Sequence, residues 1–239
     1  MTWKYLEPYV PVDPTALVLD AGGGTGRWAT RMAEKGCKVV LLDSSERMLK
    51  AAGKKVKESG LQHKITLKKG AIGKTGYADE TFDMVLCEHA LFLFKEPEIV
   101  IKELKRVLKK KAPLIISAQN RYVQSLSSLA GKPSVDNVER AFKVLVSEED
   151  ECMTKDGKVK IYTWTPQEFR DMMERNDLHV EKMVGKVVTM PLCVRQEFFM
   201  EKKHSKDLVN TILQFELALC EKPDALALAG HLQAITYRL

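Results

Sequence analysis

The sequence of 239 residues lacks long apolar runs, paired cysteines and a strong excess of either charge. No stretch approaches the roughly 20 apolar residues that a membrane-spanning helix needs. Residues 1–14 contain Lys4, Glu7 and three prolines, and they lack the apolar segment of a signal peptide. We therefore expect no membrane span and a cytoplasmic location.

The five cysteines are scattered along the chain and form no C-x-x-C pair. An odd, unpatterned set inside apolar segments predicts reduced and buried thiols. No grouping of His, Cys, Asp and Glu has the spacing that metal ligands require, so we predict no metal site.

The formal net charge of +6 is modest for a chain of this length. Much of it lies in two short runs, residues 54–57 and 105–111. Such runs are typical of solvated helix faces, so contact with nucleic acid is the less favoured interpretation.

What the sequence does contain is a regular alternation of short apolar runs and helical patterns. Composition is that of an ordinary globular protein, with 45% hydrophobic and 29% charged residues. The alternation predicts an α/β fold in which helices cover both faces of a doubly wound, mostly parallel sheet. The predicted strands are residues 16–20, 37–42, 65–69, 82–87 and 114–118, and the predicted helices between them are residues 25–35, 44–59 and 98–110.

After residue 118 the alternation stops, which predicts an insertion over residues 119–163. This insertion holds polar turns, a helical piece at residues 138–146 and an acidic run. Regular structure returns with Thr165, because it precedes Pro166 at the first helical position and Glu168 three residues after the cap. The remaining predicted elements are a strand at residues 178–189, an amphipathic helix at 204–221 and a final strand at 231–239.

The stretch "VLDAGGGTGRWA", residues 18–29, places four glycines directly behind the first predicted strand. Glycine allows positive φ and a close approach of a ligand to the backbone, and the helix that follows offers free N–H groups. A dinucleotide loop needs G-x-G-x-x-G, but Arg27 occupies the place of the third glycine. The D-x-G-x-G-x-G pattern therefore disfavours a nicotinamide-dependent oxidoreductase.

Four segments in this order resemble the class I S-adenosylmethionine-dependent methyltransferases. They are "VLDAGGGTGRWA", "VVLLDSSERMLKAA", "ETFDMVLCEHALFLF" and "ELKRVLKKKAPLIIS". The distinctive part covers residues 15–120, and the ubiquinone- and menaquinone-biosynthesis branch is the most similar. The resemblance implies a Rossmann-like, seven-stranded sheet with an antiparallel last strand. It implies one domain, with a flap at 1–14, a cofactor core at 15–118, a lid at 119–163 and a C-terminal half at 164–239 that carries a helical insertion at 190–228.

The resemblance also implies S-adenosylmethionine as the cofactor and assigns residues to it. The acid that ends the second strand, Asp43, would accept hydrogen bonds from the two ribose hydroxyls. Asp20 would orient the glycine loop or reach the methionine amino group through water. The other predicted cofactor residues are Ala21, Gly22, Gly24 and Gly26 in the loop, Ser44, Met48, Ala71 and Ile72 around the adenine, and Cys87 and Glu88 near the methionine.

One position departs from the family pattern. After the third strand the family commonly has an acid that accepts from the adenine amino group, whereas this sequence reads "GAI" with Ala71. Losing one hydrogen bond costs about 0.5–1.5 kcal/mol, or up to about tenfold in affinity, which does not abolish binding.

Candidates for contact with the methyl acceptor are fewer. His89 follows the fourth strand, where it would serve as a general base or as a polar wall. Arg121, Tyr122 and Tyr162 lie in the predicted lid, where they would clamp an anionic or aromatic acceptor or simply pack. The aromatics of residues 1–14 would fold over the cofactor or dock on the sheet.

The sequence thus favours a methyltransferase acting on a small molecule, as a monomer or homodimer. The alternatives are a non-catalytic module that binds S-adenosylmethionine and a methyltransferase that acts on protein or tRNA. Function depends on the site more than on the fold, so the acceptor and its nucleophilic atom stay open.

Overall fold

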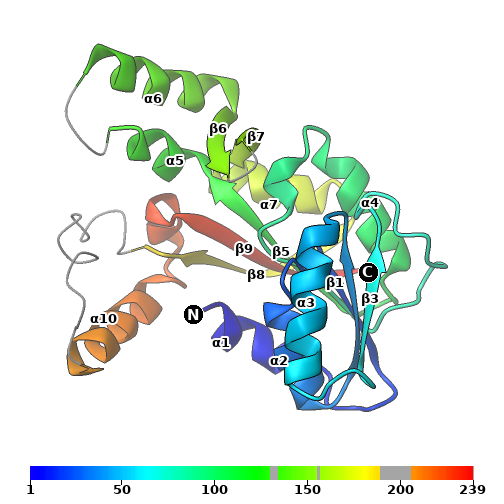
Figure 1. Ribbon diagram of the computed structural model, residues 1–239. Coiled ribbons are helices and arrows are strands. Elements are labelled where there is room, and N and C mark those ends of the chain that lie inside the picture. The colour runs from blue at the N-terminus through cyan, green and yellow to red at the C-terminus, as the bar shows by residue number, and fades with distance from the viewer. Residues whose placement is uncertain (130–133, 155–156, 189–205, 239) are drawn as a thin grey trace. The chain divides into compact units, whose positions relative to one another are not determined.

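The computed structural model describes residues 1–129, 134–154, 157–188 and 206–238. Contacts between residues group the chain into two compact units (Figure 1). The glycine-loop unit comprises Thr2–Ser117, Asp171–Lys182 and Ala234–Leu239, and the second unit comprises Met1, Ala118–Arg170 and Met183–Gln233.

Five parallel strands form the centre of the glycine-loop unit, in the order β3-β2-β1-β4-β5. All four residues of β4 are buried, as expected for a parallel strand covered on both faces. The chain order and the strand order differ on either side of β1, so the point where they reverse lies beside β1. The strands are β1 Leu17–Ala21, β2 Lys38–Asp43, β3 Ile65–Lys69, β4 Met84–Cys87 and β5 Pro113–Asn120.

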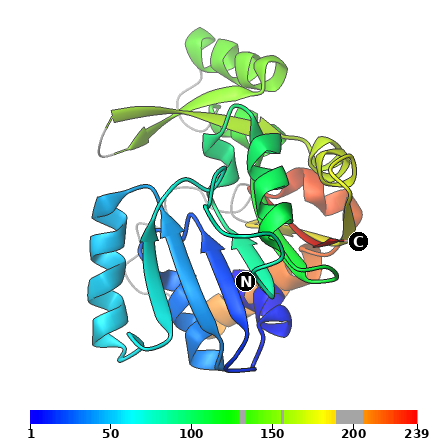
Figure 2. The ribbon, with the colours of Figure 1, turned by 90° about the vertical axis from the view of Figure 1, so that its right-hand side faces the viewer.

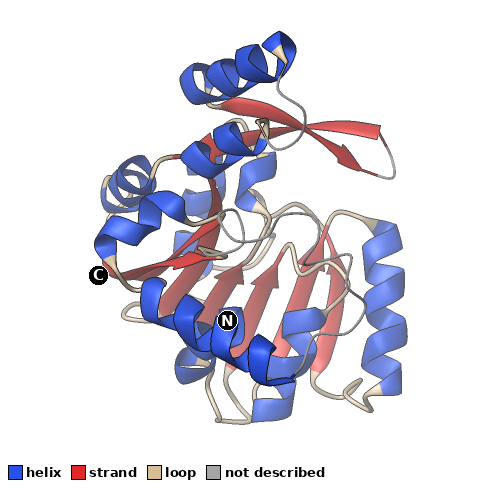
Figure 3. Cartoon of the chain, turned by 90° about the vertical axis from the view of Figure 1, so that its left-hand side faces the viewer, coloured by secondary structure: helices blue, strands red, loops and turns tan. Residues whose placement is uncertain are grey.

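Helices cover both faces of these strands. Figure 2 shows α4 in front of the strands, and Figure 3, from the opposite side, shows the N-terminal helices in front. The core between them contains Leu6, Met32 and Leu41. The helices and 3-10 turns of this unit are α1 Thr2–Leu6, η1 Glu7–Tyr9, α2 Arg27–Lys35, α3 Glu46–Glu58, η2 Leu91–Leu93 and α4 Pro97–Val107.

The helix ends follow the expected chemistry, but one predicted apolar face is rotated. Gly36 ends α2 with φ of 130°, and the Ser45 side chain caps α3 by accepting from the Met48 N–H. On α3 the sequence predicts an apolar face of Met48, Ala51 and Val56. Val56 is buried and Met48 is half-buried, whereas Ala51 is exposed and its neighbour Ala52 is buried instead. Alanine is too small to mark a face on its own.

The second unit contains elements that the sequence did not predict. The predicted insertion folds into α5 Arg121–Ser127, α6 Val135–Ser147, β6 Glu149–Thr154 and β7 Gly157–Trp164. β6 and β7 form an antiparallel hairpin, and β7 runs parallel to the end of β5, with Gln119 beside Thr163. The described chain therefore has nine strands rather than seven. The hairpin was missed because Glu151, Lys158 and Lys160 occupy exposed positions, so its apolar signal is weak. Cys152 on β6 is exposed, so the prediction of buried thiols is wrong at this position.

The C-terminal part follows the prediction more closely. Its elements are α7 Pro166–Glu174, β8 Leu178–Lys186, α10 Lys206–Leu219, η3 Pro223–Leu228 and β9 His231–Arg238. The capping box of α7 is present, since Glu168 N–H donates to Thr165 Oγ1 at 3.2 Å and Thr165 N–H donates to Glu168 Oε2 at 2.9 Å. Part of the predicted helical insertion at 190–228 lies outside the described residues.

β9 is the antiparallel strand that the fold class predicts. Lys111 N–H donates to the Arg238 carbonyl at 2.8 Å, and Asn120 N–H donates to the Gly230 carbonyl at 3.3 Å. The residue numbers rise along β5 and fall along β9, so the two strands run in opposite directions. The predicted Rossmann-like α/β fold is confirmed.

Candidate cofactor site

The glycine loop between β1 and α2 is held in a conformation that favours glycine. Gly22, Gly24 and Gly26 have φ of 74°, 53° and 77°. The N–H groups of Gly22 and Gly23 donate to the Leu42 carbonyl at 2.8 and 3.3 Å, which fixes the loop to the end of β2. A Cβ on Gly22 would lie 2.6 Å from the Ala90 Cβ, whereas a Cβ on Gly24 would meet nothing within 4 Å. The loop is therefore packed at Gly22 and faces open space at Gly24.

Asp43, at the end of β2, joins the glycine loop to the start of α3. Its Oδ2 accepts from the Gly24 N–H at 2.9 Å, and its Oδ1 accepts from the Ser45 N–H at 2.8 Å. A carboxylate has about four acceptor positions, so each oxygen keeps capacity for a second donor. The Asp43 carbonyl also accepts from the Gly70 N–H at 3.1 Å. The segments that follow β1, β2 and β3 thus meet at the carboxyl edge of the sheet.

Asp20 lies beneath this loop and is only 1% exposed. Its Oδ2 accepts from the Ala29 N–H at 3.1 Å, in the first turn of α2. Burial raises the pKa of Asp20 to about 7, and the nearby charges of Glu88 and Asp43 act in the same direction. Three carboxyl groups therefore surround the loop, and such a site favours a positively charged ligand.

The segment after β4 supplies the third side of the site. Cys87 and Glu88 are buried, and burial raises the pKa of the Cys87 thiol, which keeps it protonated. His89 has φ of 56°, a conformation that is uncommon outside glycine. Its Nε2 lies 3.4 Å from Glu88 Oε1, and its ring meets Phe92 edge-on with centroids 6.4 Å apart.

Ser117 is a residue of this site that the sequence analysis did not identify. It is buried in β5, three residues before the strand ends, and its Oγ accepts from the His89 backbone N–H at 2.9 Å. This hydrogen bond fixes the backbone of the segment that carries His89. The available signal was a polar residue in the otherwise apolar predicted strand 114–118.

The predicted adenine residues lie around the Asp43 end of the site. Ser44 is exposed and Met48 is half-buried. Ala21, which was predicted to bind the cofactor from the glycine loop, is buried in β1. Ala71 is exposed and its carbonyl accepts from the Lys74 N–H at 3.1 Å, and Ile72 is buried. As predicted, the methyl side chain of Ala71 offers no hydrogen bond.

The other predicted acceptor residues, Arg121, Tyr122 and Tyr162, lie in the second unit on α5 and β7. The buried Arg121 guanidinium donates to Glu168 Oε1 at 2.9 Å and to the Thr163 carbonyl at 3.1 Å. Tyr122 lines a hollow of about 370 Å³, with Thr165, Arg170 and Asp224 among its other walls. Tyr162 lies on β7 opposite Glu149. Arg121 is thus held by its own unit, and its role toward a substrate stays a prediction.

Residues 1–14 dock against α2 and the core of the glycine-loop unit. Trp3 stacks on Trp28 with ring centroids 6.3 Å apart and planes within 4°. Leu6 and Val10 are buried in the core, and Tyr9 Oη donates to Glu181 Oε1 at 3.4 Å. Of the two alternatives for these residues, folding over the cofactor or docking, the contacts correspond to docking.

Neither a metal site nor a membrane span is found in the described part of the chain. Across those residues no group of three His, Cys, Asp or Glu could hold an ion. No described helix has the length and apolar character to cross a bilayer.

Replacing Gly22 and Gly24 with alanine, one at a time, should distinguish a loss of stability through loop packing from a loss of ligand affinity through a side chain in the open space beside Gly24. Both residues have positive φ, so both variants carry the same backbone penalty of about 1 kcal/mol. Gly22→Ala adds the clash with Ala90, and we expect a lower free energy of unfolding, by a further ~1–3 kcal/mol. Gly24→Ala should lose only the backbone penalty of about 1 kcal/mol but bind S-adenosylhomocysteine about tenfold or more weakly. Urea unfolding and calorimetry check both, and equal loss of stability in the two variants would contradict the assignment.

Comparison with known proteins finds similarity to methyltransferases in the part of the chain that contains this site. Residues 19–116 match the family described as a methyltransferase domain. The chain is 36% identical over 107 residues to demethylmenaquinone methyltransferase of Alkalihalophilus pseudofirmus, which covers 44% of this chain and 45% of that protein. It is 20% identical over 219 residues to tRNA 5-carboxymethoxyuridine methyltransferase of Escherichia coli, which covers 90% of this chain and 77% of that protein.

The fold has counterparts among solved structures. A structure from Listeria monocytogenes, described as an S-adenosylmethionine-dependent methyltransferase, has a TM-score of 0.68 at 19% identity and covers 99% of this chain and 96% of that chain. The chain matches less than half the length of the curated relatives that are 34% to 36% identical to it. With the glycine loop and Asp43 in the expected places, residues 19–116 form a methyltransferase domain, and the chain is similar in fold to S-adenosylmethionine-dependent methyltransferases.

Proposed function

We propose that this chain transfers a methyl group from S-adenosylmethionine to a small-molecule acceptor. The observation that carries the proposal is the hydrogen bond from Gly24 N–H to Asp43, beside a loop position that faces open space. This pairing holds an acid next to a glycine cradle, an arrangement suited to a nucleoside with two adjacent hydroxyl groups.

In this proposal Asp43 accepts from the ribose hydroxyls with the acceptor capacity that its two backbone donors leave. The acidic surroundings of Asp20 and Glu88 favour the positive charge of the methionine part. Ser44, Met48 and Ile72 border the adenine, and the segment Cys87 to His89 faces the reacting end.

The bound cofactor would supply a methyl group already activated by a positively charged sulfur. The acceptor's nucleophilic atom would form a bond to that carbon as the carbon–sulfur bond broke, and the electron pair of the broken bond would stay on sulfur. The protein then has mainly to align the acceptor in line with the breaking bond. His89 is the candidate to take the acceptor's proton where the acceptor needs a base.

A small-molecule acceptor is supported by two observations. Of the two curated relatives described above, the one with the higher identity is named as a demethylmenaquinone methyltransferase, although the match covers only part of each protein. The hollow beside Tyr122, about 370 Å³, lies within the size range of small-ligand sites. The second candidate acceptor is tRNA, because the similarity to the tRNA methyltransferase extends over 90% of this chain.

The experiment has two stages. Calorimetry with S-adenosylhomocysteine tests cofactor binding, and its absence in the purified chain would overturn the whole proposal. The chain is then incubated with methyl-labelled cofactor and three fractions of a cell extract: small molecules, deproteinised tRNA and protein. Label in the first fraction supports the proposal, and label in the second or third corrects the acceptor class. Binding without transfer in any fraction favours the non-catalytic module.

A further inference from the structure

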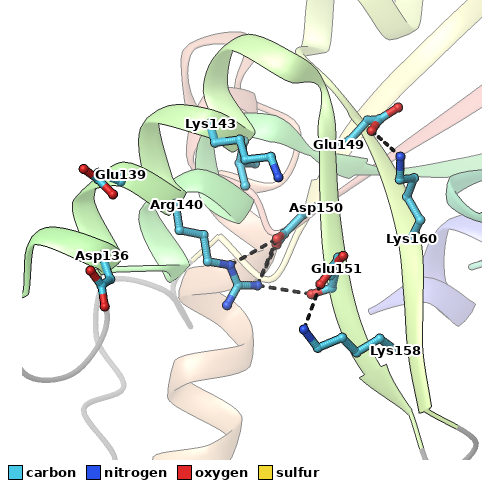
Figure 4. Close-up of a pocket in the computed structure, with 10 residues that line it drawn as sticks. Asp136, Glu139, Arg140, Lys143, Glu149, Asp150, Glu151, Lys158 and Lys160 are labelled. Atoms are coloured by element: carbon cyan, nitrogen blue, oxygen red, sulfur yellow. Dashed lines mark hydrogen bonds and ion pairs between the residues drawn. The ribbon is translucent and has the colours of Figure 1, made fainter.

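Helix α6 presents three different faces. The first face carries Ala141 and Val144, which are buried. A second face carries Asp136, Glu139, Arg140 and Lys143, which line a groove of about 580 Å³ shared with the β6–β7 hairpin (Figure 4). The third face is apolar and exposed, with exposed fractions from 41% to 72% for Val135, Val138, Phe142, Leu145 and Val146.

The exposed apolar residues form one continuous stripe. At about 100° per residue they fall within an arc of roughly 100° on α6. A stripe of this width is typical of a helix face that packs against another element, and exposed apolar patches of this kind mark interaction sites. We call these five residues the α6 stripe.

The charges beside the α6 stripe indicate which partner covers it. The polar face has two acids and two bases, whereas helices that lie on membranes carry an excess of lysine and arginine. Arg140 is engaged within its own unit, because it donates to Asp150 Oδ1 at 2.9 Å and to the Glu151 carbonyl at 3.1 Å (Figure 4). Glu139 and Lys143 are the opposite charges that flank the stripe.

We propose that the α6 stripe binds the α6 stripe of a second copy of this chain. A two-fold axis pairs the same surface on both copies, so the two helices run antiparallel. With the axis between Arg140 and Ala141, Val138 lies within one residue, about 1.5 Å, of the level of Phe142 of the second copy, and Val135 lies equally close to the level of Leu145. Glu139 then also lies within one residue of the level of Lys143 of the second copy, and the symmetry repeats this pair.

The pattern is therefore self-complementary in both shape and charge. Apolar residues meet apolar residues along the axis, and each acid meets a base on the flank. A partner of uniform charge would match only one of the two flanking residues. This is why the observations favour a second copy over an anionic surface.

Sedimentation equilibrium tests the apolar part. Phe142→Glu should raise the dimer dissociation constant at least about 50-fold, since it places two carboxylates in the centre of the interface. Val12→Glu is the matched control, because Val12 in the glycine-loop unit is 72% exposed and the added charge is the same. Circular dichroism of both variants checks that they fold. A dimer unchanged by Phe142→Glu would overturn the proposal.

A charge exchange tests the antiparallel pairing itself. Glu139→Lys and Lys143→Glu should each weaken the dimer by roughly 3- to 10-fold, because like charges then face each other. The double variant restores opposite charges and should return to within about 2-fold of the parent. A double variant weaker than either single variant would contradict this geometry.

A parent that stays monomeric at roughly 100 µM would also overturn the proposal. If that monomer binds vesicles of phosphatidylglycerol and Phe142→Glu abolishes the binding, the stripe is assigned to a membrane.

Discussion

Replacing Asp43 with alanine is expected to lower the affinity for S-adenosylhomocysteine by at least about 100-fold. The carboxylate accepts from Gly24 and Ser45, so its loss frees the glycine loop from the start of α3. In the proposed function it also removes the two hydrogen bonds to the ribose. Hydrogen bonds to charged groups contribute about 1.5–3 kcal/mol each, and two of them correspond to a factor of roughly 100 or more.

Two further variants test whether the loss of affinity is specific to the Asp43 carboxylate. Asp43→Asn keeps one acceptor oxygen but cannot serve both backbone amides and two hydroxyls, so we expect an intermediate loss of about tenfold or more. Glu46→Ala removes a nearby acid whose partner is Lys69 at 3.1 Å, and it should leave the affinity within about twofold of the parent. Isothermal titration calorimetry measures all three. Parent-like affinity in Asp43→Ala would remove the central support for the proposed site.

Much of the glycine-loop unit could be predicted from the sequence because its signals are local. Short apolar runs ending in Asp20 and Asp43 mark two adjacent strands, and the glycines mark the turn between the first strand and its helix. These features depend on residues within a few positions of one another. The parallel order then follows from the alternation of strands and helices.

The second unit could not be predicted as well, because its signals come from distant residues. β6 and β7 are defined by pairing with each other and with the end of β5, and their exposed positions carry charge. Arg121 resembled a substrate clamp in the sequence, but its partners Glu148 and Glu168 come from elsewhere in the chain. A charged residue in a predicted lid does not by itself reveal whether another part of the protein already neutralises it.

The same distinction applies within the site. The motif placed Asp43 beside the ribose, whereas the hydrogen bond that Asp43 accepts from Gly24 was not predicted and comes from the structure. Ser117 is 28 residues from His89 in the sequence, and only the fold brings the two together. Residues that position others are harder to find than residues that belong to a contiguous motif.

Asp20→Asn is expected to stabilise the ligand-free protein increasingly as the pH rises from about 4 to about 7. Burial raises the pKa of Asp20 from its ordinary value of 3.8 to about 7. In this window the unfolded chain has lost the proton while the folded chain keeps it, so the free energy of unfolding of the parent falls with rising pH. Asparagine cannot ionise, and its side-chain oxygen can still accept from Ala29.

The advantage of Asp20→Asn over the parent should therefore grow up to pH 7 and then level off. A shift of about three pH units at ~1.4 kcal/mol per unit sets the increase at about 4 kcal/mol at most. Urea unfolding of both proteins at pH 5, 6, 7 and 8 measures the difference, which cancels the titration of every other group.

Asp13→Asn provides a control with the opposite pKa shift. Hydrogen bonds from Thr15 lower the pKa of the exposed Asp13 below its ordinary value, so Asp13 is ionised in both the folded and the unfolded states above pH 5. Its stability difference from the parent should be constant from pH 5 to 8, while that of Asp20→Asn rises. If the Asp20→Asn difference is also constant, Asp20 is ionised throughout this range, and the acid beneath the glycine loop carries its charge before any cation arrives.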